Sequence, residues 1–163
     1  MQQLAMIAMA TICKPAVLIA DEPTTALDNN SQGLVLQQLK RLQKEFHTSI
    51  LLVSHDLSVV RQSCRKVMVM YCGRLLEKAD CDSLYNRPRH PYSAGLLSCI
   101  PQICATRPAA INAIPGQVPL SNELPAGCHF APRCNRVEPR CGQTVPVFES
   151  ASGDDVACFR PLA

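Results

Sequence analysis

The sequence predicts an α/β fold: a parallel β-sheet with helices, followed by an irregular proline- and cysteine-rich C-terminal extension. Two short apolar runs, "AVLIA" (16–20) and "TSILLVS" (48–54), are typical of buried parallel strands. Between them, residues 29–46 repeat apolar side chains at helical spacing. Nine of the thirteen prolines lie in 101–163, where periodic runs are few. The strand–helix–strand order indicates a parallel sheet, and the proline-rich part indicates an appendage without a large core.

The same patterns predict the remaining elements before residue 100. We expect Asp28 or Asn29 to cap the helix over 29–46. We also expect helices over 2–12 and 56–63, a short helix beginning at 90–92, and two strands within 66–79 that turn at Gly73. The change in composition divides the chain into a first domain, 1–79, and an extension, 80–163.

Composition and charge exclude several classes of protein. The 163 residues carry a formal net charge of +3 with no basic run, which argues against nucleic acid as a partner. No apolar stretch reaches the roughly 18 residues that span a bilayer. The first residues, "MQQLAMIAMATICK", have no basic segment before their apolar part and are typical of a helix, not of a secretory signal. We therefore expect a cytoplasmic protein.

Polar side chains follow both predicted parallel strands. In "VLIADEPTTALD" (17–28), Asp21 and Glu22 come directly after the apolar run. In "LLVSHDL" (51–57), His55 comes shortly after the apolar run. One carboxylate there could orient Mg²⁺ through water, and the next could polarise an attacking water. If the strands are neighbours, His55 emerges at the same edge and could bind a terminal phosphate. Taken singly, each feature also fits a solvated turn or a histidine near a helix start.

Together, the two segments resemble the ATP-binding-cassette (ABC) transporter ATPases. The resemblance implies part of a P-loop NTPase sheet, with ATP and Mg²⁺ as cofactors of the complete protein. It also implies that Asp21 orients Mg²⁺ through water and that Glu22 is the general base. Asp28 would then belong to the D-loop at the dimer interface, and His55 would contact the γ-phosphate.

Segments of the extension resemble a narrower branch of that family. These segments are "NRPRHPYSAGLLSCIP", "IPGQVPL", "LPAGCHFAPRC" and "ACFRP". They are similar to the C-terminal extension of the dipeptide, oligopeptide and antimicrobial-peptide importers. The resemblance implies a second ABC ATPase subunit and transmembrane permease subunits as partners, and a peptide delivered by a binding protein. It places the protein on the inner face of the cell membrane.

The phosphate-binding half of such an ATPase is absent from the sequence. No G-x-x-x-x-G-K-[ST] loop occurs, and no L-S-G-G-Q-like segment precedes "MQQLAMIAMA". We expect the chain to begin just after that signature, as a fragment or a truncated product, and not to hydrolyse ATP alone. The alternative is a truncated, non-catalytic metal-binding protein with a regulatory or interaction role. Truncation also predicts open sheet edges, uncovered apolar faces and poor solubility.

Four of the ten cysteines form a separate group in the extension. Cys128, Cys134, Cys141 and Cys158 are spaced C-x5-C-x6-C-x16-C. Four thiolates could hold zinc or a [4Fe–4S] cluster, and the wide gaps favour the cluster, although His129 allows a mixed zinc site. The resemblance also implies iron–sulfur ligation at these four positions. We expect most of the other cysteines to be small buried hydrophobic residues: Cys13, Cys64, Cys72, Cys81, Cys99 and Cys104.

Overall fold

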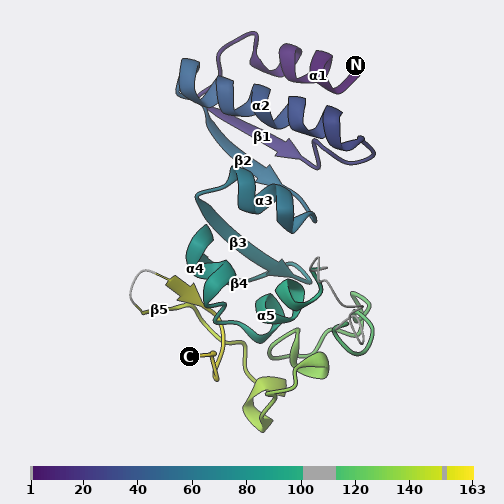
Figure 1. Cartoon of the computed structure of the whole chain (residues 1–163). Coiled ribbons are helices and arrows are strands. Elements are labelled where there is room, and N and C mark those ends of the chain that lie inside the picture. The colour runs from purple at the N-terminus through teal and green to yellow at the C-terminus, as the bar shows by residue number, and fades with distance from the viewer. Residues whose placement is uncertain (1, 101–112, 152–153) are drawn as a thin grey trace, which may run out of the picture. The chain divides into compact units, whose positions relative to one another are not determined.

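The computed structural model describes residues 2–100, 113–151 and 154–163. The chain divides into two compact units, one ending at Cys64 and the other beginning at Arg65 (Figure 1). Both units combine helices with strands, and only the first contains a parallel strand pair among the described residues. The predicted α/β class with a parallel sheet is therefore confirmed.

The N-terminal unit alternates helices and strands in the predicted order. Strands β1 and β2 pair in parallel, with Val17 opposite Ser49 and Asp21 opposite Val53. This pairing brings the carboxyl ends of both strands to one edge of the sheet. The elements are α1 (Gln2–Thr11), β1 (Val17–Asp21), α2 (Asn29–Phe46), β2 (Ser49–Val53) and α3 (Leu57–Ser63).

Aspartates begin two of these helices. The Asp28 carboxylate accepts hydrogen bonds from the backbone N–H groups of Asn30 and Ser31, so it is the N-cap of α2. Asp56 caps α3 in the same way. These contacts satisfy backbone donors that have no partner within the helix. Of the two residues predicted to cap α2, the structure uses Asp28.

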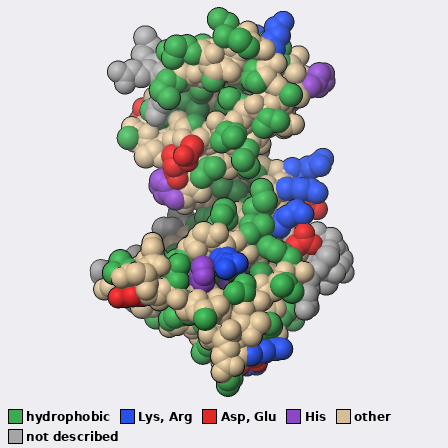
Figure 2. Space-filling model, turned by 180° about the vertical axis from the view of Figure 1, so that it is seen from behind, with side chains coloured by type: hydrophobic (Ala, Val, Ile, Leu, Met, Phe, Trp, Pro, Cys, Tyr) green, Lys and Arg blue, Asp and Glu red, His purple; other side chains and the backbone are tan. Residues whose placement is uncertain are grey.

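The core of the N-terminal unit lies on one face of the β1–β2 pair. Residues from all three helices pack with the side chains on that face. The opposite face leaves Ile19 67% exposed and Leu51 42% exposed. The expectation of buried strands was therefore wrong for this face, because the described helices cover only the other one. The exposed face agrees with the predicted lack of cover, and Figure 2 shows hydrophobic side chains over this part of the chain. The residues that pack together are Ile7, Leu18, Ala20, Leu27, Val35, Leu36, Leu39, Leu42, Ile50, Leu52 and Val59.

The C-terminal unit contains an antiparallel sheet in the strand order β3-β4-β6-β5. The turn from β3 to β4 passes through Cys72 and Gly73, both with positive φ, as the predicted turn at Gly73 requires. Strands β5 and β6 were not predicted, because "ESA" and "DDV" are short and polar. The elements are β3 (Lys66–Tyr71), β4 (Arg74–Asp80), α4 (Cys81–Asn86), α5 (Pro91–Ser98), the 3-10 helices η1 (Ala131–Arg133) and η2 (Pro139–Gly142), β5 (Glu149–Ala151) and β6 (Asp154–Val156).

An aromatic cluster joins the sheet of this unit to the loops that follow it. Phe130 meets Tyr71 edge to face at a centroid distance of 5.4 Å and lies 5.2 Å from the ring of Tyr92. Arg133 donates to the carbonyl oxygen of Pro115 at 2.9 Å and to the Tyr71 hydroxyl at 3.3 Å. These contacts position the loop that carries the cysteine group. No helix in the described ranges has the length and apolar composition needed to cross a bilayer.

Candidate functional site

Glu22 and His55 lie at the edge where β1 and β2 end. Glu22 directly follows β1, and its backbone N–H donates to the carbonyl oxygen of Val53 at 2.9 Å. Its φ of 46° is in the left-handed region and turns the chain away from the strand direction. His55 follows β2 by two residues. The parallel pairing thus brings together two side chains that are distant in the sequence, as predicted.

The Glu22 carboxylate is held at both oxygens. Oε1 accepts the backbone N–H of His55 at 3.0 Å and lies 2.8 Å from Nδ1 of the same residue. Oε2 accepts the hydroxyl of Thr25 at 2.7 Å. The hydrogen bond from the His55 ring lowers the pKa of Glu22 most, followed by that from Thr25. The same contact raises the pKa of His55. Glu22 is therefore kept ionised, as a general base must be, and is paired with a proton-carrying group.

The two predicted cofactor-binding aspartates lie on either side of Glu22 along the chain. Asp21 ends β1 with its side chain exposed. The Asp28 carboxylate is engaged as the α2 cap, and hydrogen bonding by Ser31 lowers its pKa. Asp21 and Asp28 both lie in the N-terminal unit, which also contains Glu22. Their roles toward Mg²⁺ and the D-loop stay predictions.

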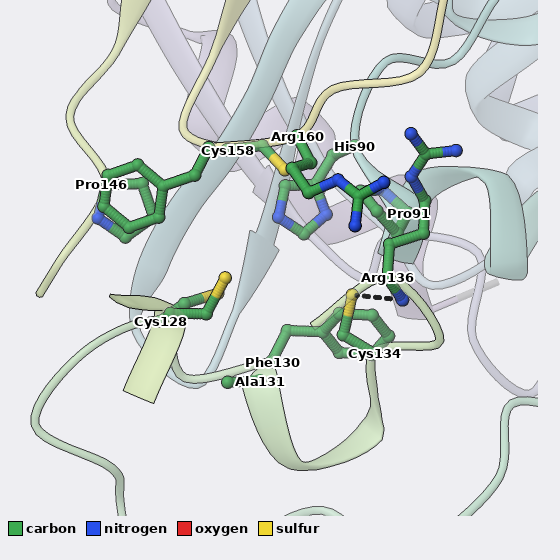
Figure 3. A pocket seen from close by; sticks show the side chains of 12 residues that line it. His90, Pro91, Cys128, Phe130, Ala131, Cys134, Arg136, Pro146, Cys158 and Arg160 are labelled. Carbon is green, nitrogen blue, oxygen red and sulfur yellow. Dashed lines mark hydrogen bonds between the residues drawn. The ribbon is translucent and has the colours of Figure 1, made fainter. Parts of the chain in front are cut away.

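The structure brings Cys128, Cys134, Cys141 and Cys158 around one cavity. Figure 3 shows Cys128, Cys134 and Cys158 on its wall. The space between the lining residues is about 340 Å³, its opening to solvent included. The described cysteines are free thiols, with no disulfide among them. The residues that line the cavity are His90, Pro91, Cys128, Phe130, Ala131, Cys134, Arg136, Cys141, Pro146, Cys158, Phe159 and Arg160.

A backbone N–H group donates to one of these sulfur atoms, that of Arg136 to Cys134 Sγ, at an N···S distance of 3.4 Å. Backbone hydrogen bonding also acts to lower the pKa of Cys128 and Cys158. Burial raises the pKa of all three thiols, whereas these hydrogen bonds act in the opposite direction. Each of the three is also affected electrostatically by other cysteines of the group. The backbone is thus arranged to stabilise negative charge on sulfur.

No set of three or more His, Cys, Asp or Glu side chains in the described residues could hold a single metal ion as placed. His129 is not among the residues that line the four-cysteine cavity. Its Nδ1 instead lies 2.9 Å from the carbonyl oxygen of Cys72. The mixed zinc site that His129 allowed therefore has no support in this arrangement. The expectation of a cluster, or of zinc on four cysteines, stays a prediction.

His90 lines the same cavity and was not assigned to a site from the sequence. It is 1% exposed, and burial lowers its pKa to about 4. Its Nδ1 accepts the backbone N–H of Tyr92 at 3.0 Å, which caps α5 and leaves the proton of the neutral ring on Nε2. The buried carboxylate of Glu77 accepts the N–H groups of Arg89 and His90 at 2.7 and 2.8 Å. The sequence signal was the histidine before a helix-starting proline, which predicted only a cap.

The other cysteines are less buried than expected. Only Cys81 is buried among those described outside the cavity, whereas Cys13 is exposed and Cys64, Cys72 and Cys99 are partly exposed. The expectation was wrong for these four because they lie near the ends of elements or in turns. Cys104 lies outside the described residues.

Comparison with known proteins supports the resemblance seen in the sequence. Residues 76–141 match the family described as "Oligopeptide/dipeptide transporter, C-terminal region". The chain is 48% identical over 160 residues to the oligopeptide transport ATP-binding protein AppD of Bacillus subtilis, covering 98% of this chain and 48% of that protein. It is 44% identical over 162 residues to OppD of Escherichia coli, covering 99% of this chain and 48% of that protein.

A solved structure also matches: cbiO1 from Clostridium perfringens, described as part of the ABC transporter complex cbiONQ, at a TM-score of 0.47 and 32% identity, covering 50% of this chain and 32% of that chain. Its curated sequence relatives are named as ATP-binding proteins of transport systems. Within that class, it is a relative of the oligopeptide transport ATP-binding proteins. The chain spans about half the length of the curated relatives that it matches.

Proposed function

We propose that the chain is the C-terminal portion of the ATP-hydrolysing subunit that energises a bacterial peptide ABC importer. The observation that carries this proposal is the hydrogen-bonded pair of Glu22 and His55 at the carboxyl ends of two parallel strands. This edge is where open α/β sheets bind their ligands. The relatives named as oligopeptide transport ATP-binding proteins support the substrate class.

Each residue of the pair's neighbourhood has a role in this proposal. Glu22, kept ionised by His55 and Thr25, accepts the proton of the attacking water. His55 moves from Glu22 toward the terminal phosphate when nucleotide is present. Asp21 orients Mg²⁺ through water, the ordinary way in which carboxylates hold this ion. Asp28 lies in the D-loop facing the second ATPase subunit.

The partners follow from the same proposal. They are a second ABC ATPase subunit, identical or homologous, and transmembrane permease subunits, with the peptide supplied through a binding protein. The protein then works on the cytoplasmic side of the membrane, bound to the permease. We assign residues 1–79 to the nucleotide-binding domain and 80–163 to the importer-type extension. The family match covers 76–141, most of which lies within the proposed extension.

The sequence contains no phosphate-cradling loop, and we propose that the 163-residue chain by itself does not hydrolyse ATP. Two measurements test this. The source genome is read upstream of the first codon, where we expect an in-frame G-x-x-x-x-G-K-[ST] loop followed by an L-S-G-G-like segment. The purified chain is then assayed for ATP turnover. Turnover that Glu22→Gln abolishes would contradict the proposed inactivity, and unrelated upstream sequence would contradict the proposed membership of a longer ATPase.

The four-cysteine cavity supports a second element of the proposal, a [4Fe–4S] cluster, with zinc as the alternative. Four free thiols line one cavity, Cys134 accepts the backbone N–H of Arg136, and the apolar rings of Phe130 and Phe159 border the space. The donor set fits a tetrathiolate group, because thiolates are the ligands of both cluster and structural zinc. When bound, such a group would cross-link the loops of the extension and stabilise their fold.

The cavity also favours the second candidate function, a non-catalytic metal-binding protein with a regulatory or interaction role. Anaerobic reconstitution of the whole chain with iron and sulfide tests the metal. We expect a brown protein whose iron and sulfide are lost when Cys128 or Cys158 is changed to Ser and retained in Cys13→Ser. A colourless protein that binds zinc instead would contradict the cluster.

A further inference from the structure

Two cysteines of the cavity lie on backbone segments that are hydrogen-bonded to each other. The N–H of Cys128 donates to the carbonyl oxygen of Cys141 at 2.7 Å. Standard bond lengths along this link keep the two Cα atoms within about 7 Å of each other, the limit beyond which a disulfide cannot form without backbone movement. In the described ranges, no other pair of the four cysteines is joined by a backbone hydrogen bond.

The side chains of these two cysteines also share one space. Cys128 and Cys141 line the same cavity, and both are free thiols of intermediate exposure. The Cys128 thiol interacts electrostatically with that of Cys141. Gly127 allows the two segments to lie this close, since a Cβ there would be 2.3 Å from the Cys141 carbonyl oxygen. The packing therefore favours an approach of the two sulfur atoms.

A second, larger groove reaches Cys128 from another side. The space between its lining residues is about 740 Å³, its opening to solvent included. Most of these residues are apolar, the exposed Arg74 adds a positive charge, and no Asp or Glu of the described residues is among them. Cys128 is the only one of the four cysteines that borders this groove. It is therefore the thiol that an anionic reagent in solution can reach from there.

We propose that Cys128 and Cys141 form a redox-sensitive dithiol that reacts with low-molecular-weight disulfides bearing carboxylates. The Cys128 thiolate attacks one sulfur of such a disulfide, so that a mixed disulfide forms and one thiolate leaves. The Cys141 thiolate then attacks the Cys128 sulfur and expels the second. Two protein thiols are oxidised to one disulfide, the reagent is reduced to two thiols, and the two protons pass to these products.

This modification site goes beyond the proposed cluster and does not depend on it. The thiolate is the form of cysteine that binds metals, so a disulfide would leave only two of the four cysteines for a metal. A reactive cysteine beside a second cysteine that resolves the mixed disulfide is typical of redox sensors. The pair makes the extension responsive to the balance of thiols and disulfides around it.

The experiment treats the whole chain, reduced and free of metal, with oxidised glutathione. Remaining thiols are alkylated, and disulfides and glutathione adducts are located by mass spectrometry after cleavage at Arg and Glu. Cleavage after Arg133, Arg140 and Glu149 places the four cysteines in different peptides. Circular dichroism checks that each variant is folded.

We expect a Cys128–Cys141 disulfide in the unchanged chain and in Cys134→Ser, the matched control from the same cavity. In Cys141→Ser, the reaction within the four-cysteine group should stop at one glutathione on Cys128. A disulfide that joins Cys128 or Cys141 to Cys134 or Cys158 instead, or four thiols that stay reduced, would overturn the proposal.

The preference for carboxylates is tested with Arg74→Gln and two reagents. We expect this variant to react several-fold more slowly than the unchanged chain with oxidised glutathione, and equally fast with the uncharged 2-hydroxyethyl disulfide. The reason is that the side chain of Arg74 attracts the carboxylates of glutathione only. Equal rates of both chains with oxidised glutathione would refute the proposed reagent class, even where the Cys128–Cys141 disulfide forms.

Discussion

The carboxylate of Glu22 and the ring of His55 are 33 residues apart in the sequence, yet Glu22 Oε1 lies 2.8 Å from His55 Nδ1. The parallel pairing of β1 and β2 produces this contact, because each residue follows the carboxyl end of one strand. The pair is the part of the proposed catalytic machinery that this chain carries, and its protonation can be measured without nucleotide.

We expect His55 to titrate above the ordinary histidine pKa of about 6.5. The cause is its hydrogen bond to the Glu22 carboxylate, which favours the protonated ring. Replacing Glu22 with Gln removes the charge and should bring the pKa of His55 back toward the ordinary value. The measurement is an NMR titration of the ring protons. Glu45→Gln is the control, since that carboxylate pairs with Arg41, and an unchanged His55 titration in Glu22→Gln would refute the assignment.

The coupling between these two residues should depend on pH in a bell-shaped way. The pKa of Glu22 is lowered on folding, so its contribution is lost as pH falls below about 4.5 and through the lowered value. The pKa of His55 is raised, so its contribution is lost as pH rises above about 6.5 and through the raised value. A double-mutant cycle of Glu22→Gln and His55→Ala, measured by urea unfolding, should show coupling between these limits. Coupling that is equal at pH 3, 6 and 9 would contradict it.

Gly127 should be essential for the shape of the cysteine cavity. A Cβ on this residue would lie 2.3 Å from the carbonyl oxygen of Cys141, which accepts the backbone N–H of Cys128 at 2.7 Å. Gly127→Ala must push the backbone at position 127 away from that at Cys141, at a cost of about 1–3 kcal/mol in the free energy of unfolding. Gly142→Ala is the matched control, because its Cβ would meet nothing within 4 Å. Metal content and urea unfolding of both variants check the prediction, and equal behaviour would contradict it.

The exposed face of the β1–β2 pair should make the chain self-associate. Ile19 and Leu51 are 67% and 42% exposed on that face. Replacing both with Thr places a β-branched side chain, which suits a strand, at each position and removes apolar surface. We expect sedimentation velocity to show a shift toward monomer for this double variant. Met68→Thr, on an exposed position of β3, is the control; a monodisperse monomer for the unchanged chain would rule the prediction out.

The sequence was sufficient for the regular elements of the N-terminal unit. Apolar runs and helical spacing predicted β1, α2 and β2, and the expected pairing of the two strands predicted that Glu22 and His55 share an edge. The two-sided burial of β1 was predicted from the apolar character of both of its faces. Which face is covered, however, depends on what packs against the strand, as exposed Ile19 shows.

Of the residues that form the site in the C-terminal unit, only the cysteines were predicted from the sequence. Spacing cannot show that the N–H of Cys128 meets the carbonyl of Cys141, because the loops have no repeating pattern and are fixed by such single contacts. His90 was assigned only to a helix start, and Arg136 was not assigned at all.

The most direct test of the central claim is ATP hydrolysis by a chimaera. The chain is joined to the portion of Bacillus subtilis AppD that it does not match, and turnover is measured for the chimaera and for its Glu22→Gln and Glu45→Gln variants. We predict that the chimaera and Glu45→Gln hydrolyse ATP, and that Glu22→Gln binds ATP but loses hydrolysis by a factor of roughly 10² or more. A folded chimaera that hydrolyses ATP equally well with Gln at position 22 would contradict the assignment of this chain as the hydrolytic half of the ATPase.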